Sequence, residues 1–243
     1  MHIIKLNATD STNSYMRRLS SEESLEDYTI VTTNHQTHGR GQMGTVWSSE
    51  NSKNLMFSVF KDTSGFDLEY PFLISMVTSL AILKTLQSFS ISKLAIKWPN
   101  DILSEDKKIC GILIENVIKQ NNLSNTIIGI GLNVNQTEFS HLPKASSLKS
   151  ITGYVFDLEE VLHAIIKNLK NYFRILKRGD YLTLKVEYES YLFRKDKPST
   201  FKDAEGLVFS GYIKNVSYLG NLQVLLEDDI IKEFDLKEIT LLY

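Results

Sequence analysis

The segment Gly39-Arg40-Gly41-Gln42-Met43-Gly44 combines backbone freedom with a single cationic side chain. Glycine lets the main chain come close to a ligand, and the Arg40 guanidinium can pair with a carboxylate or a phosphate. The spacing matches the dinucleotide fingerprint G-x-G-x-x-G, which requires a helix directly after the loop. Residues 45–54 are too few and too polar for a crossover helix, although Asp62 follows the next apolar run as a Rossmann acid would. A Rossmann-type dehydrogenase is therefore the weaker interpretation, and the Gly-Lys-Ser/Thr ending of a P-loop is missing.

In three further segments, polar residues or glycines lie within or at the ends of apolar stretches that read as strands. Residues 97–101 leave an apolar strand through proline and deliver an amide and a carboxylate, a pattern that an ordinary Asx-Pro turn would also produce. Residues 107–113 carry a lysine pair at the mouth of an apolar strand, where lysines usually face solvent. Gly129 and Gly131 alternate along a third strand, which leaves one face bare, as if a flat ligand lay against it.

The elements that must position these residues follow from apolar periodicity. Ser11 and its neighbours can cap a short helix, and a polar loop at 34–54 separates two predicted strands. Pro71 opens a long core helix, and Asp157 with Glu160 makes a capping signal for a second that ends at Gly179. The remaining predictions are a helix at 181–192 and strands at 28–33, 55–60, 94–98, 109–117 and 126–134.

The composition changes at residues 194–198, which are charged and contain a proline, as is typical of a domain junction. Beyond this point the pattern is all-β, with strands predicted at 208–216, 222–226, 230–234 and 239–242. Hairpin turns are expected at Gly220-Asn221 and Asp228-Asp229. We therefore predict an α+β protein with two domains, residues 1–194 and 195–243.

The overall composition argues against several classes of function. The chain has 27 basic and 29 acidic residues, and a net charge of -2 provides no footprint for nucleic acid. The single cysteine, Cys110, is expected to be a buried hydrophobe, and no apolar stretch approaches the roughly 18 residues of a membrane span. The histidines, including His35 and His38, show no metal-binding spacing. Residues 1–10 contain no signal sequence, so a cytoplasmic protein is expected.

Together and in this order, the segments resemble the bacterial biotin protein ligase family over the whole chain. The motifs that carry the resemblance are Ser11-Thr12-Asn13, residues 36–41 followed by Trp47, and residues 97–101, 108–111, 129–133 and 236–239. The resemblance implies a catalytic domain of the class II aminoacyl-tRNA-synthetase-like type, followed by a small SH3-like β-barrel. Because only ten residues precede Ser11, we expect a member without the N-terminal DNA-binding domain.

The resemblance also implies a reaction. Biotin would be activated with ATP to biotinyl-5'-AMP and transferred to one lysine of a biotin carrier protein, such as an acetyl-CoA carboxylase subunit. Lys108 and Arg40 would be catalytic, and Asp101 is the expected ligand of Mg²⁺. Trp47 and Trp98 are set aside as packing residues. Many family members carry a second arginine where this chain has Gln42, which leaves one cation in the loop.

The implied ligand-binding residues come from all of these motifs. Those expected to bind biotin are Ser11, Thr12, Asn13, Gln36, Gly39, Arg40, Gly41, Gln42, Lys108, Gly111, Gly129 and Gly131. Those expected to bind ATP are Arg40, Asn100, Asp101, Lys108 and Asn133. A lipoate protein ligase and a non-catalytic biotin sensor are the alternatives. The expected partner is the carrier domain of a carboxylase, without nucleic acid or membrane, and the expected assembly is a monomer or a weak homodimer.

Overall fold

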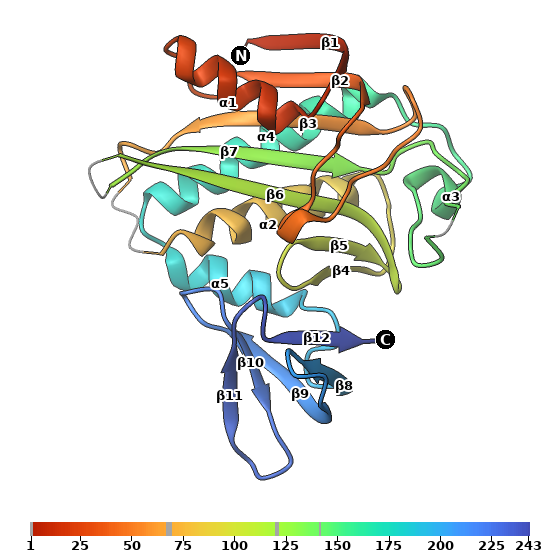
Figure 1. Cartoon of the computed structure of the whole chain (residues 1–243), viewed down its shortest axis with the longest axis vertical. Helices are drawn as coiled ribbons and strands as arrows, with labels where there is room; N and C mark the ends of the chain where they lie inside the picture. The colour runs from red at the N-terminus through yellow and green to blue at the C-terminus, as the bar shows by residue number, and fades with distance from the viewer. Residues whose placement is uncertain (1, 67–69, 120–121, 141) are drawn as a thin grey trace.

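The computed structural model describes residues 2–66, 70–119, 122–140 and 142–243. A seven-stranded sheet forms the larger part of the molecule, in the spatial order β1-β2-β3-β7-β6-β5-β4 (Figure 1). The strands are β1 (Ile3–Thr9), β2 (Ile30–Gln36), β3 (Leu55–Asp62), β4 (Leu94–Lys97), β5 (Asp101–Ser104), β6 (Lys107–Lys119) and β7 (Asn122–Leu132). Only the β1–β2 pair is parallel, and the other neighbours are antiparallel. This topology contradicts the Rossmann alternative, which requires parallel strands joined by helices.

The sheet has two different faces because successive side chains point to opposite sides of a strand. One face packs its aliphatic residues against α2 (Phe72–Ser88) and α4 (Leu158–Lys177), which form the main core. Above the other face lies α1 (Thr12–Glu22), where Met16 completes a smaller apolar cluster. The second face carries few large side chains toward the β6 side, and it is this face that forms the site described below.

The ends of α4 lie where local signals place them, whereas the Ser11 side chain makes no capping hydrogen bond at the start of α1. The Asp157 carboxylate accepts hydrogen bonds from the backbone N–H groups of Glu159 and Glu160, which confirms the predicted cap of α4. The helix stops at Lys177, just before Gly179, whose φ is +77°. The next helix, α5 (Tyr181–Ser190), is two residues shorter than predicted at its C-terminal end.

A second, antiparallel sheet forms the small C-terminal module at the bottom of Figure 1. Its strands are β8 (Pro198–Asp203), β9 (Val208–Val216), β10 (Leu222–Leu225), β11 (Ile231–Phe234) and β12 (Ile239–Leu242), in the order β11-β10-β9-β8-β12. The module is tied to the larger part by hydrogen bonds from Trp98 Nε1 to the Gly220 carbonyl, and from the Val216 N–H to the Glu189 carboxylate. The fold is therefore α+β with an SH3-like C-terminal domain, as predicted.

Three short elements were not predicted. The strand β5 directly follows the turn that contains Pro99, β8 begins at Pro198 within the charged stretch, and α3 (Leu148–Thr152) has five residues. Each is too short to establish a hydrophobic period of its own. Pairing with neighbouring strands stabilises β5 and β8, and the Ser147 side chain caps α3 by accepting from the Ser150 N–H. The position of the domain boundary at residues 194–195 stays a prediction.

Candidate active site

A cavity of about 420 Å³ lies between the second face of the large sheet, the 37–47 loop and the C-terminal module. Thirteen of the residues predicted to bind ligand line it: Ser11, Thr12, Asn13, Gln36, Arg40, Gly41, Gln42, Asn100, Asp101, Lys108, Gly111, Gly129 and Gly131. Two predicted residues do not. Gly39 is buried within the loop. The Asn133 side chain is buried, with its Nδ2 donating to the Ser146 carbonyl at 3.0 Å.

The register of the sheet explains why residues from distant segments meet here. Gly131 of β7 is opposite Gly111 of β6, which in turn is opposite Asp101 of β5. Because directly paired residues share one face of a sheet, all three are turned toward the cavity. The next row on this face contains Leu113 and Gly129. The alternate glycines thus lower the floor of the cavity.

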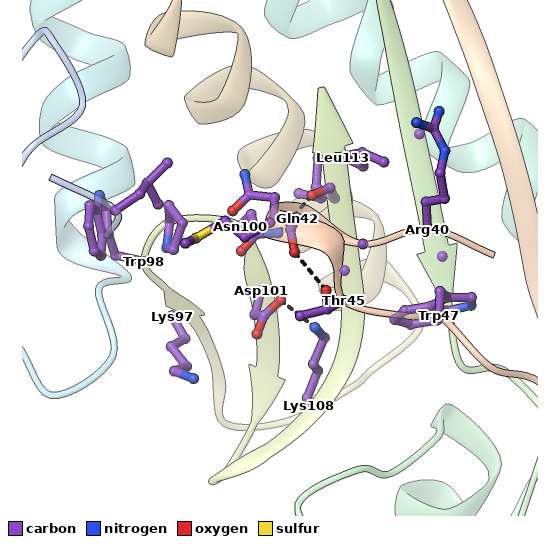
Figure 2. Close-up of a pocket in the computed structure, with 18 of the residues that line it drawn as sticks. Arg40, Gln42, Thr45, Trp47, Lys97, Trp98, Asn100, Asp101, Lys108 and Leu113 are labelled. Carbon is purple, nitrogen blue, oxygen red and sulfur yellow. Dashed lines mark hydrogen bonds and ion pairs between the residues drawn. The ribbon is translucent and has the colours of Figure 1, made fainter. Parts of the chain in front are cut away.

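One end of the cavity is cationic. Lys108 Nζ lies 2.6 Å from Asp101 Oδ1, with 36% of the lysine side chain and 14% of the aspartate side chain exposed (Figure 2). Lys97 lies at the same end, and burial lowers the pKa of its amine, with the nearby charges of Lys108 and Lys144 acting in the same direction. Charge that develops on a ligand oxygen here would meet preorganised cations. We call this the lysine end.

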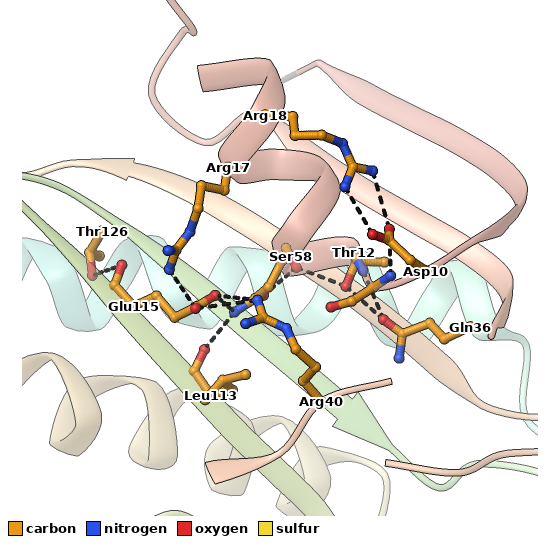
Figure 3. Close-up of polar contacts among 12 residues, drawn as sticks. Asp10, Thr12, Arg17, Arg18, Gln36, Arg40, Ser58, Leu113, Glu115 and Thr126 are labelled. Atoms are coloured by element: carbon orange, nitrogen blue, oxygen red, sulfur yellow. Dashed lines mark hydrogen bonds and ion pairs between the residues drawn. The ribbon is translucent and has the colours of Figure 1, made fainter. Parts of the chain in front are cut away.

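The other end consists of hydroxyl and amide groups (Figure 3). The Gln36 amide oxygen accepts from the backbone N–H of Thr12 at 2.8 Å. Ser58 Oγ lies 2.8 Å from Thr12 Oγ1 and 2.5 Å from Asn13 Oδ1. Gly129 leaves room for this arrangement, because a Cβ there would stand 2.3 Å from Asn13 Oδ1. We call this the hydroxyl end.

The glycine-rich loop folds back on itself over the cavity. The Gly41 N–H donates to the Thr45 carbonyl at 2.7 Å, and the Trp47 N–H donates to the Gly39 carbonyl at 2.9 Å. A Cβ on Gly39 would stand 2.2 Å from the Trp47 carbonyl oxygen, so this glycine is required for the close approach of the two chain segments. A single 3₁₀ turn, η1 (Gln42–Gly44), follows instead of the helix that a dinucleotide site demands.

The indole of Trp47 covers the bare glycine face. A Cβ on Gly131 would stand 2.5 Å from the ring and one on Gly111 would stand 3.0 Å from it. Its Nε1 is buried and has no hydrogen-bond partner among the described residues. The alternate glycines did predict a flat partner, but the group that lies there in this structure is a side chain of the same protein. Trp47 therefore belongs to the site, and sequence analysis had set it aside.

Arg40 and Lys108 serve opposite ends of the cavity. Figure 2 shows the Arg40 guanidinium directed away from the Lys108–Asp101 pair, and its Nη2 lies 3.0 Å from Glu115 Oε2. Sequence analysis missed Glu115. The available signal was the single carboxylate in the mostly apolar run of residues 109–117.

The comparisons with known proteins agree with this geometry. A model of the biotin/lipoate A/B protein ligase family matches residues 6–133. The bifunctional ligase/repressor BirA of Bacillus spizizenii is 29% identical over 194 residues, which cover 78% of this chain and 59% of that protein. The biotin–acetyl-CoA-carboxylase ligase of Paracoccus denitrificans is 31% identical over 162 residues, which cover 63% and 65% of the two chains.

Solved structures extend the match to nearly the whole chain. The biotin protein ligase of Aquifex aeolicus, in complex with biotin and ATP, is 28% identical with a TM-score of 0.83, and the match covers 99% of this chain and 98% of that one. By contrast, the chain spans about three-fifths of the length of the BirA relatives that it matches. The family model alone covers more than half of the chain. This chain belongs to the biotin/lipoate A/B protein ligase family.

Proposed function

We propose that this protein is a biotin protein ligase, which activates biotin with ATP to biotinyl-5'-AMP and transfers biotin to one lysine of a carrier domain. The observation that carries the proposal is the match, over nearly both full lengths, to a ligase solved with biotin and ATP. The cavity supports it, since a cationic end and a hydroxyl end share one apolar-floored space. Its volume lies in the usual range for small-molecule sites.

The hydroxyl end suits the ureido ring of biotin. A ureido group has one carbonyl acceptor and two N–H donors, and it carries no charge. Ser11, Thr12 and Gln36 offer neutral donors and acceptors at this end, and Asn13 lies beside them with its amide already hydrogen-bonded within the protein. Biotin placed in this orientation would direct its carboxylate toward Lys108.

The lysine end suits the activation step. A carboxylate oxygen of biotin attacks the α-phosphorus of ATP, the bond to the bridging oxygen breaks, and pyrophosphate leaves. The Lys108 ammonium stabilises the negative charge that accumulates on the phosphate oxygens, and the Asp101 carboxylate holds this ammonium in place. Lys97, at the same end, adds a second positive charge for the leaving pyrophosphate.

Magnesium fits the same end. Mg²⁺ is usually bound by one or two carboxylates together with substrate phosphates, and it neutralises phosphate charge. Asp101 is the one carboxylate among the described residues that line the cavity. Within the described part of the chain, no group of three acidic, histidine or cysteine side chains could hold a resident ion. Asp101, with the Asn100 amide beside it, would supply the protein ligands for an ion that arrives with ATP.

The transfer step requires mainly positioning. The amine of the carrier lysine attacks the acyl carbon of the anhydride, an amide bond forms, and AMP leaves while the amine releases its proton. The loop that carries Arg40 and Gln42 closes over the intermediate, since water would otherwise hydrolyse it. Thr240 and Leu241 line the cavity, so the C-terminal module borders it.

The remaining expectations are part of the proposal. The partner is a biotin carrier domain, and the protein binds neither nucleic acid nor a membrane. It acts in the cytoplasm as a monomer or a weak homodimer. No helix in the described ranges is long and apolar enough to cross a bilayer. The net charge of -2 gives no electrostatic reason to expect DNA binding.

The two alternatives are separated by one assay. Pyrophosphate exchange into ATP is measured with biotin and with lipoate, side by side, on the wild-type protein. A biotin ligase exchanges label only in the presence of biotin. Exchange that depends on lipoate would favour the other branch of the family, and binding of biotin without exchange would favour a sensor.

A further inference from the structure

A buried carboxylate lies next to the cavity, and the reaction described above does not use it. Glu115 stands in the middle of β6, on the same face as Gly111 and Leu113, and only 14% of its side chain is exposed. Two elements supply its partners: Arg17 and Asn13 come from α1, and Arg40 comes from the loop (Figure 3). A carboxylate leaves water only at a large cost, which such partners offset.

The contacts of Glu115 fix the orientation of the Asn13 amide. Asn13 Nδ2 donates to Glu115 Oε2 at 2.8 Å and to the Leu113 carbonyl at 3.2 Å. Both hydrogens of the amide nitrogen are therefore used on the β6 side. The amide oxygen is left facing Ser58, where it can act only as an acceptor.

This orientation determines which way the hydroxyl groups point. Ser58 carries one hydrogen, and Asn13 Oδ1 at 2.5 Å is its shorter contact, so that hydrogen goes to Asn13. The 2.8 Å contact between Ser58 and Thr12 is then supplied by the Thr12 hydrogen, because the other acceptor near Thr12 Oγ1, Gln36 Oε1, is farther away at 3.3 Å. Thr12 Oγ1 keeps its lone pairs and can accept a hydrogen bond in the cavity. The hydroxyl end thus presents an acceptor to a ligand N–H because Glu115 holds Asn13.

Glu115 also fastens the loop. Arg40 Nη2 lies 3.0 and 3.3 Å from the two oxygens of Glu115, although 42% of the Arg40 side chain is exposed. Arg17 Nη2 stands 2.5 Å from Oε1 and adds a second positive charge from α1. One carboxylate therefore connects the loop, the first helix and the floor of the cavity.

We propose that Glu115 is a positioning residue for biotin: it sets the acceptor character of the Thr12 end and holds the loop closed through Arg40. The proposal rests on the ligase function proposed above. It predicts an effect confined to one substrate, because Glu115 contacts the hydroxyl end and neither Lys108 nor Asp101. A carboxylate that only stabilised the fold would affect both substrates equally.

The test is Glu115→Gln, which keeps the shape of the side chain but removes the negative charge and one of the two acceptor oxygens that Asn13, Arg17 and Arg40 share. The matched control is Glu159→Gln, which removes the carboxylate of the exposed Lys5–Glu159 pair, far from the cavity lining. Pyrophosphate exchange is measured as a function of biotin and, separately, of ATP. Trypsin cleavage after Arg40 is followed in the protein without ligand.

For Glu115→Gln we expect the KM for biotin to rise about tenfold, because one charge-assisted contact is lost. The KM for ATP should stay within about twofold of the wild-type value. Cleavage after Arg40 should be several-fold faster, and Glu115→Asp should recover part of both effects. Glu159→Gln should match the wild type. An unchanged KM for biotin, or equal increases for biotin and ATP, would overturn the proposal. If the wild type showed no biotin-dependent exchange, the proposed function would fail, whereas an unchanged cleavage rate in Glu115→Gln would refute the role of Glu115 by itself.

Discussion

Lys108 Nζ and Asp101 Oδ1 lie 2.6 Å apart at the cationic end of the cavity, each on the first residues of its strand. The pair is partly exposed, so neither residue is required to fill the core. A bulge in the pairing of β5 with β6 lies between Ile102 and Leu103 and shifts Lys108 out of the regular register. This arrangement makes the ammonium available to a ligand while a carboxylate orients it.

Lys108→Ala should lower the rate of biotin-dependent pyrophosphate exchange by at least about a hundredfold, because transition-state charge loses its preorganised cation. The free energy of unfolding should change by less than about 1 kcal/mol, since the side chain is half-buried and leaves no core cavity. The control is Lys107→Ala, which removes the exposed neighbouring lysine. Near-normal exchange in Lys108→Ala, with the fold intact, would remove this lysine from the mechanism.

Gly131→Ala should weaken binding of biotin and of the adenylate by about tenfold or more. The added Cβ would stand 2.5 Å from the Trp47 ring, so the indole and the loop that carries it must move. Binding is measured by calorimetry, and the environment of the indole by tryptophan fluorescence. Gly65→Ala is the control, because a Cβ there meets no atom within 4 Å. Affinity equal to that of the wild type would mean that the loop does not need this contact.

Gln42→Arg should slow the escape of biotinyl-5'-AMP several-fold. Gln42 lines the cavity, and Arg40 is engaged by Glu115, so the loop offers the phosphate no free cation. Exchanging a neutral hydrogen bond for a charge-assisted one gains on the order of 1 kcal/mol, and such gains appear mainly in dissociation rates. The adenylate is loaded onto each variant, and its release into a trap is followed, with Gln42→Met as the uncharged control. Unchanged or faster release from Gln42→Arg would show that position 42 does not contact the phosphate.

Asp10→Asn should reduce the dependence of stability on pH in the acidic range. Hydrogen bonds from Arg18 hold the pKa of the Asp10 carboxyl well below its usual value. Because the folded-state pKa is depressed, the stabilisation is present above the unfolded value of about 3.9 and is lost as the pH falls further. The pair is exposed and screened, so the contribution at neutral pH is about 0.5 kcal/mol. The free energy of unfolding in urea is measured at pH 7 and pH 3 for the wild type, for Asp10→Asn and for the control Asp228→Asn, which lies in an exposed turn. Equal pH dependence in the wild type and in Asp10→Asn would contradict the depressed pKa of Asp10.

Much of this site was predictable because its motifs are local. The alternate glycines of β7 predicted a bare surface, residues 97–101 predicted a turn with polar groups, and Lys108 stood at the start of an apolar run. The sheet register brings these residues together. Glu115 could not be assigned in this way, since its arginine partners lie 98 and 75 residues away in the chain. The role of Trp47 could not be predicted for a different reason. In the sequence, a tryptophan in a polar loop gives the same pattern whether its indole packs on the loop or on the glycines of the sheet.

The most direct test of the central claim is the mass of a carrier protein after reaction. A biotin carboxyl-carrier domain is incubated with ATP, biotin and either wild-type protein or Lys108→Ala, and intact-mass and peptide analysis follow. The account predicts one added biotinyl group on a single lysine with the wild type, dependent on both ATP and biotin, and almost none with Lys108→Ala. An unmodified carrier in the presence of folded wild-type protein, or a lipoyl adduct formed in preference when both acids are supplied, would contradict it.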